Sequence, residues 1–216
     1  MAEKLLILHG IWNARSWVLP LARRMRALGF DAEIFAYPSV LGGAEAAIPA
    51  LTRRIRQSGP TLLLGHSLGG VIALEALRRA PDLPVARLVC LGSPLCGSQA
   101  ARTLVGRRWT APLLGRSGDF LDRGCQPWSG VTEVGMVAGT VARGVGRLFA
   151  RIDGPSDGTV SLAETRLPGL ADHCNVASSH TGLVFSAAAA RQAAAFLRQG
   201  RFLPADALPG PGSNQR

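Results

Sequence analysis

The sequence predicts an α/β fold: a doubly wound, mostly parallel sheet of about six strands with helices on both faces. Short apolar runs alternate with longer amphipathic segments along most of the chain, which is the pattern of strands joined by crossover helices. The 216 residues suffice to bury one sizeable core, and a content of 47% hydrophobic and 18% charged residues is typical of a globular protein.

The N-terminal part contains two expected strands and two expected helices. The run 5–8 is continuously apolar and ends at a His-Gly pair, as a strand buried on both faces would. The segment 16–28 has apolar residues at helical spacing and is followed by Gly29, a common helix stop. A second strand is expected over 31–37, and a second helix, with arginines on one side, over 44–57.

The alternation continues through the rest of the chain. A strand over 61–64 leads through a glycine-rich turn into a helix over 68–80, which Pro81 closes. Further strands are expected at 86–91, 131–137 and 174–177, and an alanine-rich helix at 182–199.

We expect one domain over residues 1–200. A short, Gly- and Arg-rich, cap-like insertion spans about 96–130, and residues 201–216 form a Pro- and Gly-rich, loosely ordered tail. The large apolar side chains of the insertion would suit a flap over an apolar ligand. They would equally suit a loop packed on the core, and both interpretations stay open.

A nucleophile motif lies between the expected strand 61–64 and the helix 68–80. Gly65-His66-Ser67-Leu68-Gly69 matches G-x-S-x-G, and a strand–turn–helix context is the one in which this motif exposes its serine. The turn is so tight that the serine takes a strained backbone conformation, and only very small residues fit on either side. Ser67 is therefore the predicted nucleophile.

With this motif, the sequence resembles the α/β-hydrolase superfamily, in particular its small lidless lipases and esterases. The resemblance covers most of the chain, from residue 5 to about 197. Its further motifs are Leu8-His9-Gly10, Asp157-Gly158-Thr159-Val160 and His180-Thr181-Gly182-Leu183. It implies a Ser-Asp-His triad and an oxyanion hole. Because the sequence has no P-loop, dinucleotide fingerprint or HExxH motif, we expect no cofactor and no metal.

His180 is the predicted base, because a serine hydroxyl needs a base to take its proton. It lies in a loop that leads into the last helix, and the resemblance places the base in such a loop. His173, also late in the chain, stays as the alternative base. His66 directly precedes the nucleophile in the sequence, but the tight turn at Ser67 points the side chains of neighbouring residues apart.

Asp157 is the predicted orienting acid. A carboxylate fixes the tautomer of the base, and in this fold it follows the serine and precedes the histidine in the sequence. Asp157 meets this order, and its Asp-Gly-Thr-Val context resembles the acid loop of many hydrolases. Asp153, in an Asp-Gly pair, stays as the alternative acid, or as a residue that only forms a turn.

The backbone N–H groups of Ile11 and Leu68 are the predicted oxyanion hole. The superfamily uses the N–H of the residue after the nucleophile and one N–H in the loop after the first strand of the fold. In that loop, Gly10 allows the backbone to approach the substrate closely. Trp12 and Trp17 follow in the same segment. They are expected either to border the substrate pocket or to pack in the core.

The net charge of +10 comes from arginines that are spread in pairs along the chain rather than gathered into a basic tail. We expect them to form solvated faces, with a weak attraction to anionic lipid surfaces and no binding of nucleic acid. The sequence does not indicate an oligomeric state.

The four cysteines match no metal or redox spacing. Cys90, in an apolar run, is expected to pack as a small hydrophobe. Cys96 and Cys125 flank the insertion and would pair in an exported protein. Since the apolar run near Met1 is too short for a secretory signal, and no run approaches the ~18 residues that span a bilayer, we expect free thiols and a cytoplasmic protein.

The sequence thus predicts a serine hydrolase that cleaves small-molecule or lipid esters through an acyl-enzyme on Ser67. Two alternatives stay open: a thioesterase or acyltransferase that uses the same triad, and a non-catalytic binding protein. The acyl chain length and the alcohol are not indicated.

Overall fold

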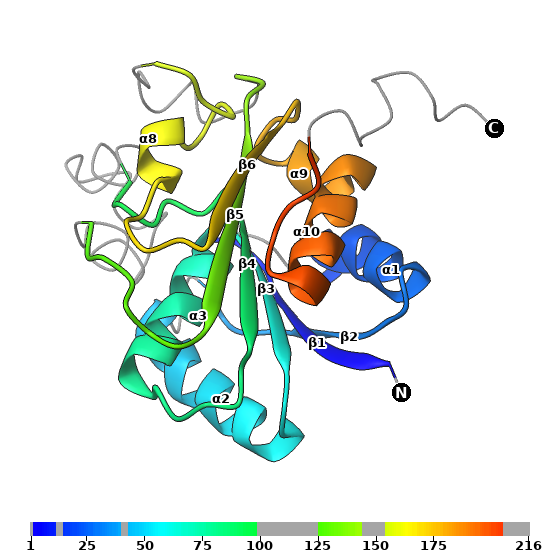
Figure 1. The fold of residues 1–216 in the computed structure, drawn as a ribbon, viewed down its shortest axis with the longest axis vertical. Coiled ribbons are helices and arrows are strands. Elements are labelled where there is room, and N and C mark those ends of the chain that lie inside the picture. The colour runs from blue at the N-terminus through cyan, green and yellow to red at the C-terminus, as the bar shows by residue number, and fades with distance from the viewer. Residues whose placement is uncertain (1, 12–14, 40–42, 99–124, 144–153, 205–216) are drawn as a thin grey trace.

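A computed structural model describes residues 2–11, 15–39, 43–98, 125–143 and 154–204 (Figure 1). Six strands form one sheet in the order β2-β1-β3-β4-β5-β6, and every neighbouring pair is parallel. The strands are β1 (Glu3–Leu8), β2 (Phe30–Phe35), β3 (Leu62–His66), β4 (Arg87–Leu91), β5 (Glu133–Gly139) and β6 (Asp172–Val176). The predicted parallel sheet with helices on both faces is confirmed.

Helices cover the two faces of the sheet in two groups, as Figure 1 shows. The first group is α2 (Gly43–Ser58) and α3 (Leu68–Arg79). The second is α1 (Leu19–Ala27), which follows the 3-10 helix η1 (Arg15–Val18), together with α9 (Gly182–Phe185) and α10 (Ala187–Gln199). A further short helix, α8 (Leu162–Thr165), precedes β6.

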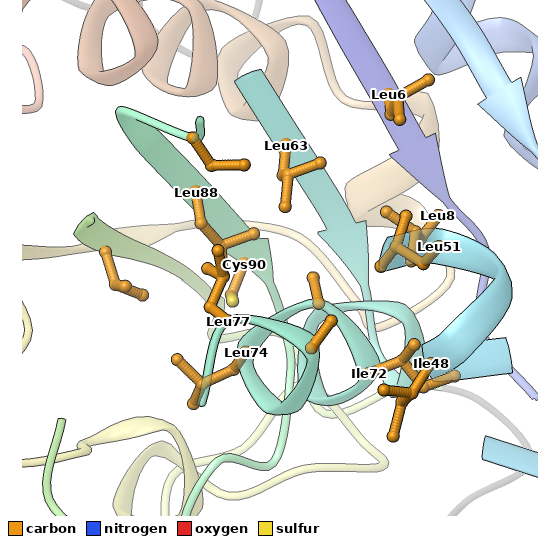
Figure 2. Packing of buried hydrophobic residues seen from close by; sticks show 14 of the residues in the cluster. Leu6, Leu8, Ile48, Leu51, Leu63, Ile72, Leu74, Leu77, Leu88 and Cys90 are labelled. Atoms are coloured by element: carbon orange, nitrogen blue, oxygen red, sulfur yellow. The ribbon is translucent and has the colours of Figure 1, made fainter. Parts of the chain in front are cut away.

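The sheet separates two hydrophobic cores, because successive side chains of a strand point to opposite faces. Leu6 and Leu8 of β1 pack with α2 and α3, whereas Leu5 and Ile7 pack with α1 and α10. Figure 2 shows the first core, in which Cys90 is buried among leucines as the predicted small hydrophobe. Burial on both faces explains why the central strands are continuous apolar runs.

The strand order reverses beside β1. The chain passes from β1 outward to β2 and then returns to form β3 on the other side of β1. In open α/β sheets, ligands bind at such a switch point, beyond the carboxyl ends of the strands. The loop at 9–11 follows β1, and the Ser67 turn follows β3. The two therefore meet where a ligand-binding site is expected.

The C-terminal helix predicted over 182–199 is interrupted. The structure ends α9 at Phe185 and begins α10 at Ala187, with Ser186 between them in an extended conformation. The Ser186 side chain accepts a hydrogen bond from the N–H of Ala189 at 3.1 Å, so it caps the second helix. The apolar pattern continues across this break, which is why the sequence suggested one helix.

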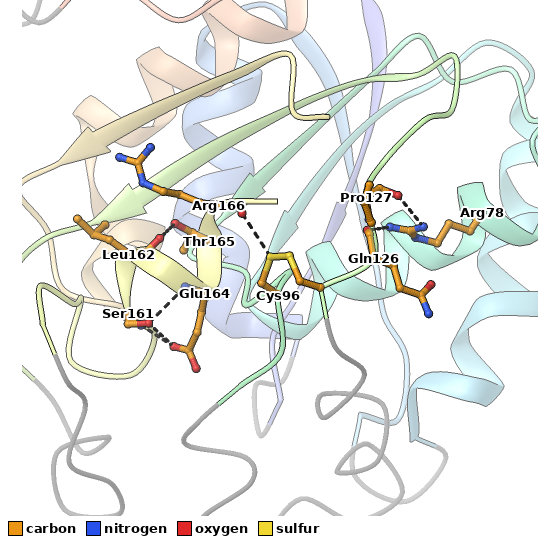
Figure 3. Close-up of a disulfide and its surroundings, with 10 residues drawn as sticks. Arg78, Cys96, Gln126, Pro127, Ser161, Leu162, Glu164, Thr165 and Arg166 are labelled. Carbon is orange, nitrogen blue, oxygen red and sulfur yellow. Dashed lines mark hydrogen bonds between the residues drawn. A yellow bond between two sulfur atoms is a disulfide. The ribbon is translucent and has the colours of Figure 1, made fainter. Parts of the chain in front are cut away.

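The prediction of free thiols is wrong for Cys96 and Cys125, which form a disulfide (Figure 3). Hydrogen bonds hold the chain beside each cysteine. The N–H of Cys96 donates to Glu164, and Arg78 donates to the carbonyl oxygens of Gln126 and Pro127. Free thiols were expected because the protein was expected in the cytoplasm, whereas disulfides persist mainly in oxidising compartments.

Two predicted segments fall largely outside the described residues. Of the insertion at about 96–130, the structure describes both ends but not 99–124, and of the tail at 201–216 it describes 201–204. In the described part of the chain, no helix is long and apolar enough to cross a membrane.

Candidate active site

Ser67 occupies a strained turn between β3 and α3. Its backbone φ is 54° and its ψ is −122°, and it is the single non-glycine residue with a positive φ in the described part of the chain. Its N–H donates to the carbonyl oxygen of Leu91 at 2.9 Å, so the neighbouring strand holds the turn in place. Such strain persists where the surroundings enforce it, and it is the conformation predicted for this serine.

Two glycines make the turn sterically feasible. A Cβ on Gly65 would lie 2.4 Å from the backbone of Gly70, and a Cβ on Gly69 would lie 2.7 Å from the carbonyl oxygens of Leu8 and His9. The first helical turn of α3 therefore packs directly on the end of β1. A side chain at Gly69 would push the serine turn away from the end of β1, and a side chain at Gly65 would clash with the backbone at the start of α3.

His180 connects Ser67 to Asp157. Its Nε2 lies 3.0 Å from Ser67 Oγ, and its Nδ1 lies 2.7 Å from Asp157 Oδ2. Because a carboxylate only accepts hydrogen bonds, Nδ1 carries the proton, and Nε2 offers a lone pair to the serine hydroxyl. The three residues come from three loops at the carboxyl ends of the strands.

Asp157 is held by the loop around it. Its side chain is almost fully buried, and Oδ1 accepts hydrogen bonds from the N–H groups of Thr159 (2.9 Å) and Val160 (2.7 Å). The other oxygen is thereby left to His180. The Asp157 carbonyl oxygen also accepts from the N–H of His180 at 2.9 Å, so the two residues are joined through both backbone and side chains.

The alternative base lies elsewhere. His173 is in β6, where its Nε2 is 3.0 Å from Thr165 Oγ1, and burial lowers its pKa. The alternative acid, Asp153, lies outside the described residues. The structure thus brings together Ser67, His180 and Asp157.

His66 contacts His180, a contact that was not predicted from the sequence. It is buried, its ring centroid lies 4.9 Å from that of His180, and its Nε2 is 3.1 Å from the His180 carbonyl oxygen. Burial first, and then the nearby His180 imidazole, lower the pKa of His66 to about 3. His66 is therefore neutral at pH 7 and does not compete for the serine proton.

A His9–Tyr37 pair shapes the loop after β1. The two rings stack with centroids 4.3 Å apart, and the Tyr37 hydroxyl donates to the His9 carbonyl oxygen. The Tyr37 N–H points at His9 Nε2 (3.4 Å), so His9 Nδ1 carries the proton and donates to the Gly10 carbonyl oxygen at 2.9 Å. Burial lowers the pKa of His9 and raises that of Tyr37, so both are neutral at pH 7.

This pair fixes the orientation of the Ile11 N–H. The carbonyl of Gly10 and the N–H of Ile11 belong to one trans peptide plane and point in opposite directions. Since His9 holds the carbonyl, the N–H is directed away from His9. Leu68 is the first residue of α3, so its N–H has no acceptor within the helix.

Of the two tryptophans predicted near the pocket, Trp12 lies outside the described residues. Trp17, in η1, is 41% exposed and meets Phe185, which is 45% exposed, edge to face at 6.0 Å. Phe185 ends α9, which begins two residues after His180. The alternative that Trp17 is an ordinary core residue is therefore wrong.

Other features of the described residues lie away from Ser67. A cavity of about 720 Å³ lies at the opposite end of the sheet, beside Thr61 and Leu62 at the start of β3. Within the described ranges, no three His, Cys, Asp or Glu side chains gather as metal ligands would.

A lipase, a pyrethroid hydrolase and a carboxyl esterase are among the solved structures with a similar fold. Bacillus licheniformis lipase BlEst2 in its mature form has a TM-score of 0.70 at 20% identity, with 91% of each chain covered. The pyrethroid hydrolase PytH has a TM-score of 0.64 at 16% identity over 93% of this chain and 99% of its own. The metagenomic carboxyl esterase MGS0156 has a TM-score of 0.63 at 18% identity, over 83% and 65%.

No family model and no curated protein matches the sequence. The similarity to solved structures is thus one of architecture. It agrees with the six-stranded parallel sheet described above, and the fold predicted from the sequence is confirmed.

Proposed function

Since the chain has the α/β-hydrolase fold, we propose that it is a serine hydrolase that cleaves carboxylic esters through an acyl-enzyme on Ser67. His180 is the base and Asp157 the orienting acid. One observation carries the proposal: a continuous series of contacts runs from Ser67 Oγ to His180 Nε2 (3.0 Å) and from His180 Nδ1 to Asp157 Oδ2 (2.7 Å). Both distances suit proton transfer and tautomer control.

In the first half-reaction, Ser67 Oγ forms a bond to the ester carbonyl carbon while His180 Nε2 takes the hydroxyl proton. The carbonyl π electrons move onto oxygen and give a tetrahedral oxyanion. When this intermediate collapses, the bond to the alcohol oxygen breaks, and His180 Nε2–H donates the proton to it. Asp157 stabilises the imidazolium throughout without itself taking the proton.

In the second half-reaction, water takes the place of the alcohol. His180 Nε2 removes a proton from water as the water oxygen attacks the acyl carbon. The second tetrahedral intermediate collapses by breaking the bond to Ser67 Oγ, to which His180 returns the proton. The carboxylic acid leaves, and the serine hydroxyl is regenerated.

The oxyanion is stabilised by the N–H groups of Ile11 and Leu68. Hydrogen-bond donors that are oriented before the reaction stabilise developing charge without reorganising. The Gly10 carbonyl, held by His9, supports this role for Ile11. The N–H of Leu68, which has no acceptor within α3, supports it for Leu68.

The acyl group lies against Trp17, with Phe185 beside it and Trp12 on the same segment. Trp17 follows the oxyanion loop and Phe185 follows the base, and the two rings meet while remaining more than a third exposed. Large aromatic surfaces at the edge of a site favour apolar ligands. The substrate is therefore a small-molecule or lipid ester. We further propose that residues 1–200 form one domain.

The test measures hydrolysis of p-nitrophenyl acetate, butyrate and decanoate by the protein and by a Ser67→Ala variant. We expect turnover by the wild type, loss of at least about 10³-fold in the variant, and labelling of Ser67 by a fluorophosphonate probe. Equal turnover by both proteins would refute the proposal. Turnover of acyl-CoA with only feeble ester cleavage would assign the same triad to a thioesterase.

A further inference from the structure

His66 makes a contact that the Ser–His–Asp mechanism does not use. Each of the four polar groups of His180 has a hydrogen-bond partner. Its N–H and Nδ1 pair with Asp157, and its Nε2 pairs with Ser67. The fourth group, the carbonyl oxygen, lies 3.1 Å from His66 Nε2, so His66 is the partner of His180 that stands outside the triad.

The chemistry of this contact fixes the protonation of His66. A carbonyl oxygen only accepts hydrogen bonds, so Nε2 of His66 carries the proton and donates it to His180. Nδ1 is then unprotonated. It is buried and has no hydrogen-bond partner among the described residues. A buried unpartnered nitrogen is costly, so the contribution of His66 to the site comes from its other nitrogen and from the packing of its ring.

The position of His66 couples the nucleophile to the base loop. His66 ends β3, and the next residue is Ser67, whose N–H is bonded to β4. His66 therefore shares the rigid sheet with the nucleophile, and it reaches across 114 residues of sequence to the backbone of the base. The tilted packing of the two imidazole rings, with centroids 4.9 Å apart, limits movement of the His180 ring toward the sheet.

We propose that His66 is a positioning residue that holds the His180 loop at reaction distance from Ser67, through the hydrogen bond from its Nε2–H to the His180 carbonyl oxygen. It does not touch the reacting atoms. Without this bond, the partly buried carbonyl loses its partner and the base loop moves away from the nucleophile. A misplacement of about 1 Å in a catalytic group costs about 10²-fold in rate.

Two variants separate the hydrogen bond from the volume of the ring. In His66→Gln, the side-chain amide keeps an N–H donor near the position of Nε2, whereas His66→Leu removes it. This proposal rests on the proposed function, so wild type and Ser67→Ala are assayed in parallel. His173→Leu is the matched control, because it removes a half-buried histidine that contacts Thr165 instead of His180.

For His66→Leu we expect kcat for p-nitrophenyl butyrate to fall by about tenfold to about a hundredfold, with KM within about twofold. His66→Gln recovers most of the loss, and His173→Leu stays near wild type. A full-rate His66→Leu would overturn the proposal, and so would equal losses in the Gln and Leu variants. If wild type and Ser67→Ala were equally active, the proposed function would fail instead.

A second measurement needs neither a variant nor activity. In protein labelled with ¹⁵N at histidine, the imidazole nitrogens distinguish the two neutral tautomers and the charged form. We expect His66 at pH 7 to be neutral with the proton on Nε2. A proton on Nδ1, or on both nitrogens, would contradict the proposed hydrogen bond to His180, independently of any measured hydrolytic activity.

Discussion

The buried His66 makes the stability of the protein depend on pH. In the unfolded chain its pKa is the ordinary 6.5, whereas in the folded protein burial and the nearby His180 imidazole lower it to about 3. Between these values the unfolded state binds a proton that the native state does not, so stability rises with pH. The contribution is complete above pH 6.5 and is lost as the pH falls toward 3.

The size of the effect follows from the two pKa values. Each pKa unit corresponds to about 1.4 kcal/mol, so at pH 5, about 1.5 units below the unfolded pKa, the folded protein loses about 2 kcal/mol relative to pH 8. Glutamine does not titrate. His66→Gln should therefore remove this loss and flatten the pH dependence by the same amount, whatever its stability at pH 8.

The assay is urea unfolding, followed by circular dichroism, at pH 8 and pH 5 for both proteins. His9 and His173, whose pKa values are also lowered by burial, contribute to the slope in both proteins and cancel in the comparison. A pH-dependent difference between wild type and His66→Gln of less than about 0.5 kcal/mol would refute the reasoning, provided that the urea dependence is the same.

Three further predictions concern the site and the disulfide. Asp157→Asn should lower kcat by about 10⁴-fold and leave the circular dichroism spectrum unchanged, because an amide favours the wrong tautomer of the base; a loss below about tenfold in ester hydrolysis would argue against its role. Phe185→Ala should reduce kcat/KM for p-nitrophenyl decanoate by about tenfold and for the acetate by less than about twofold, while Val131→Ser, at an 88% exposed apolar position near the start of β5, should change neither. Thiol titration of unfolded, unreduced protein should count two of the four cysteines, and peptide mapping should find Cys96 joined to Cys125; four reactive thiols would contradict the pair.

Local sequence was enough to predict the tight turn at Ser67. The Ser67 turn needs a strand before it, a helix after it and glycines on both sides, and all of these lie within about 20 residues. The parallel sheet followed from apolar runs separated by amphipathic segments, because burial on both faces leaves that pattern. The order of Ser67, Asp157 and His180 along the chain was informative for the same fold.

Contacts between distant segments were not predictable in this way. His66 meets the His180 backbone across 114 residues, and Tyr37 meets His9 across 28, yet neither pair has a characteristic spacing. What could have indicated these contacts is the position of each histidine: His66 directly precedes Ser67, and His9 directly precedes the Gly10-Ile11 segment. The pairing of Cys96 with Cys125 was considered from the sequence, but free thiols were expected because the protein was expected to be cytoplasmic.

The disulfide has a consequence for protein engineering. It joins the two ends of the 97–124 segment, and the hydrogen bonds beside Cys96 and at Gln126 hold both ends to the rest of the domain. The cost of closing a loop grows only with the logarithm of its length, about 0.6 kcal/mol for each doubling. We therefore expect that segments of other lengths and origins can be grafted between the two cysteines without shifting β4, β5 or the proposed triad, which makes this junction a place to exchange inserted segments on a constant sheet.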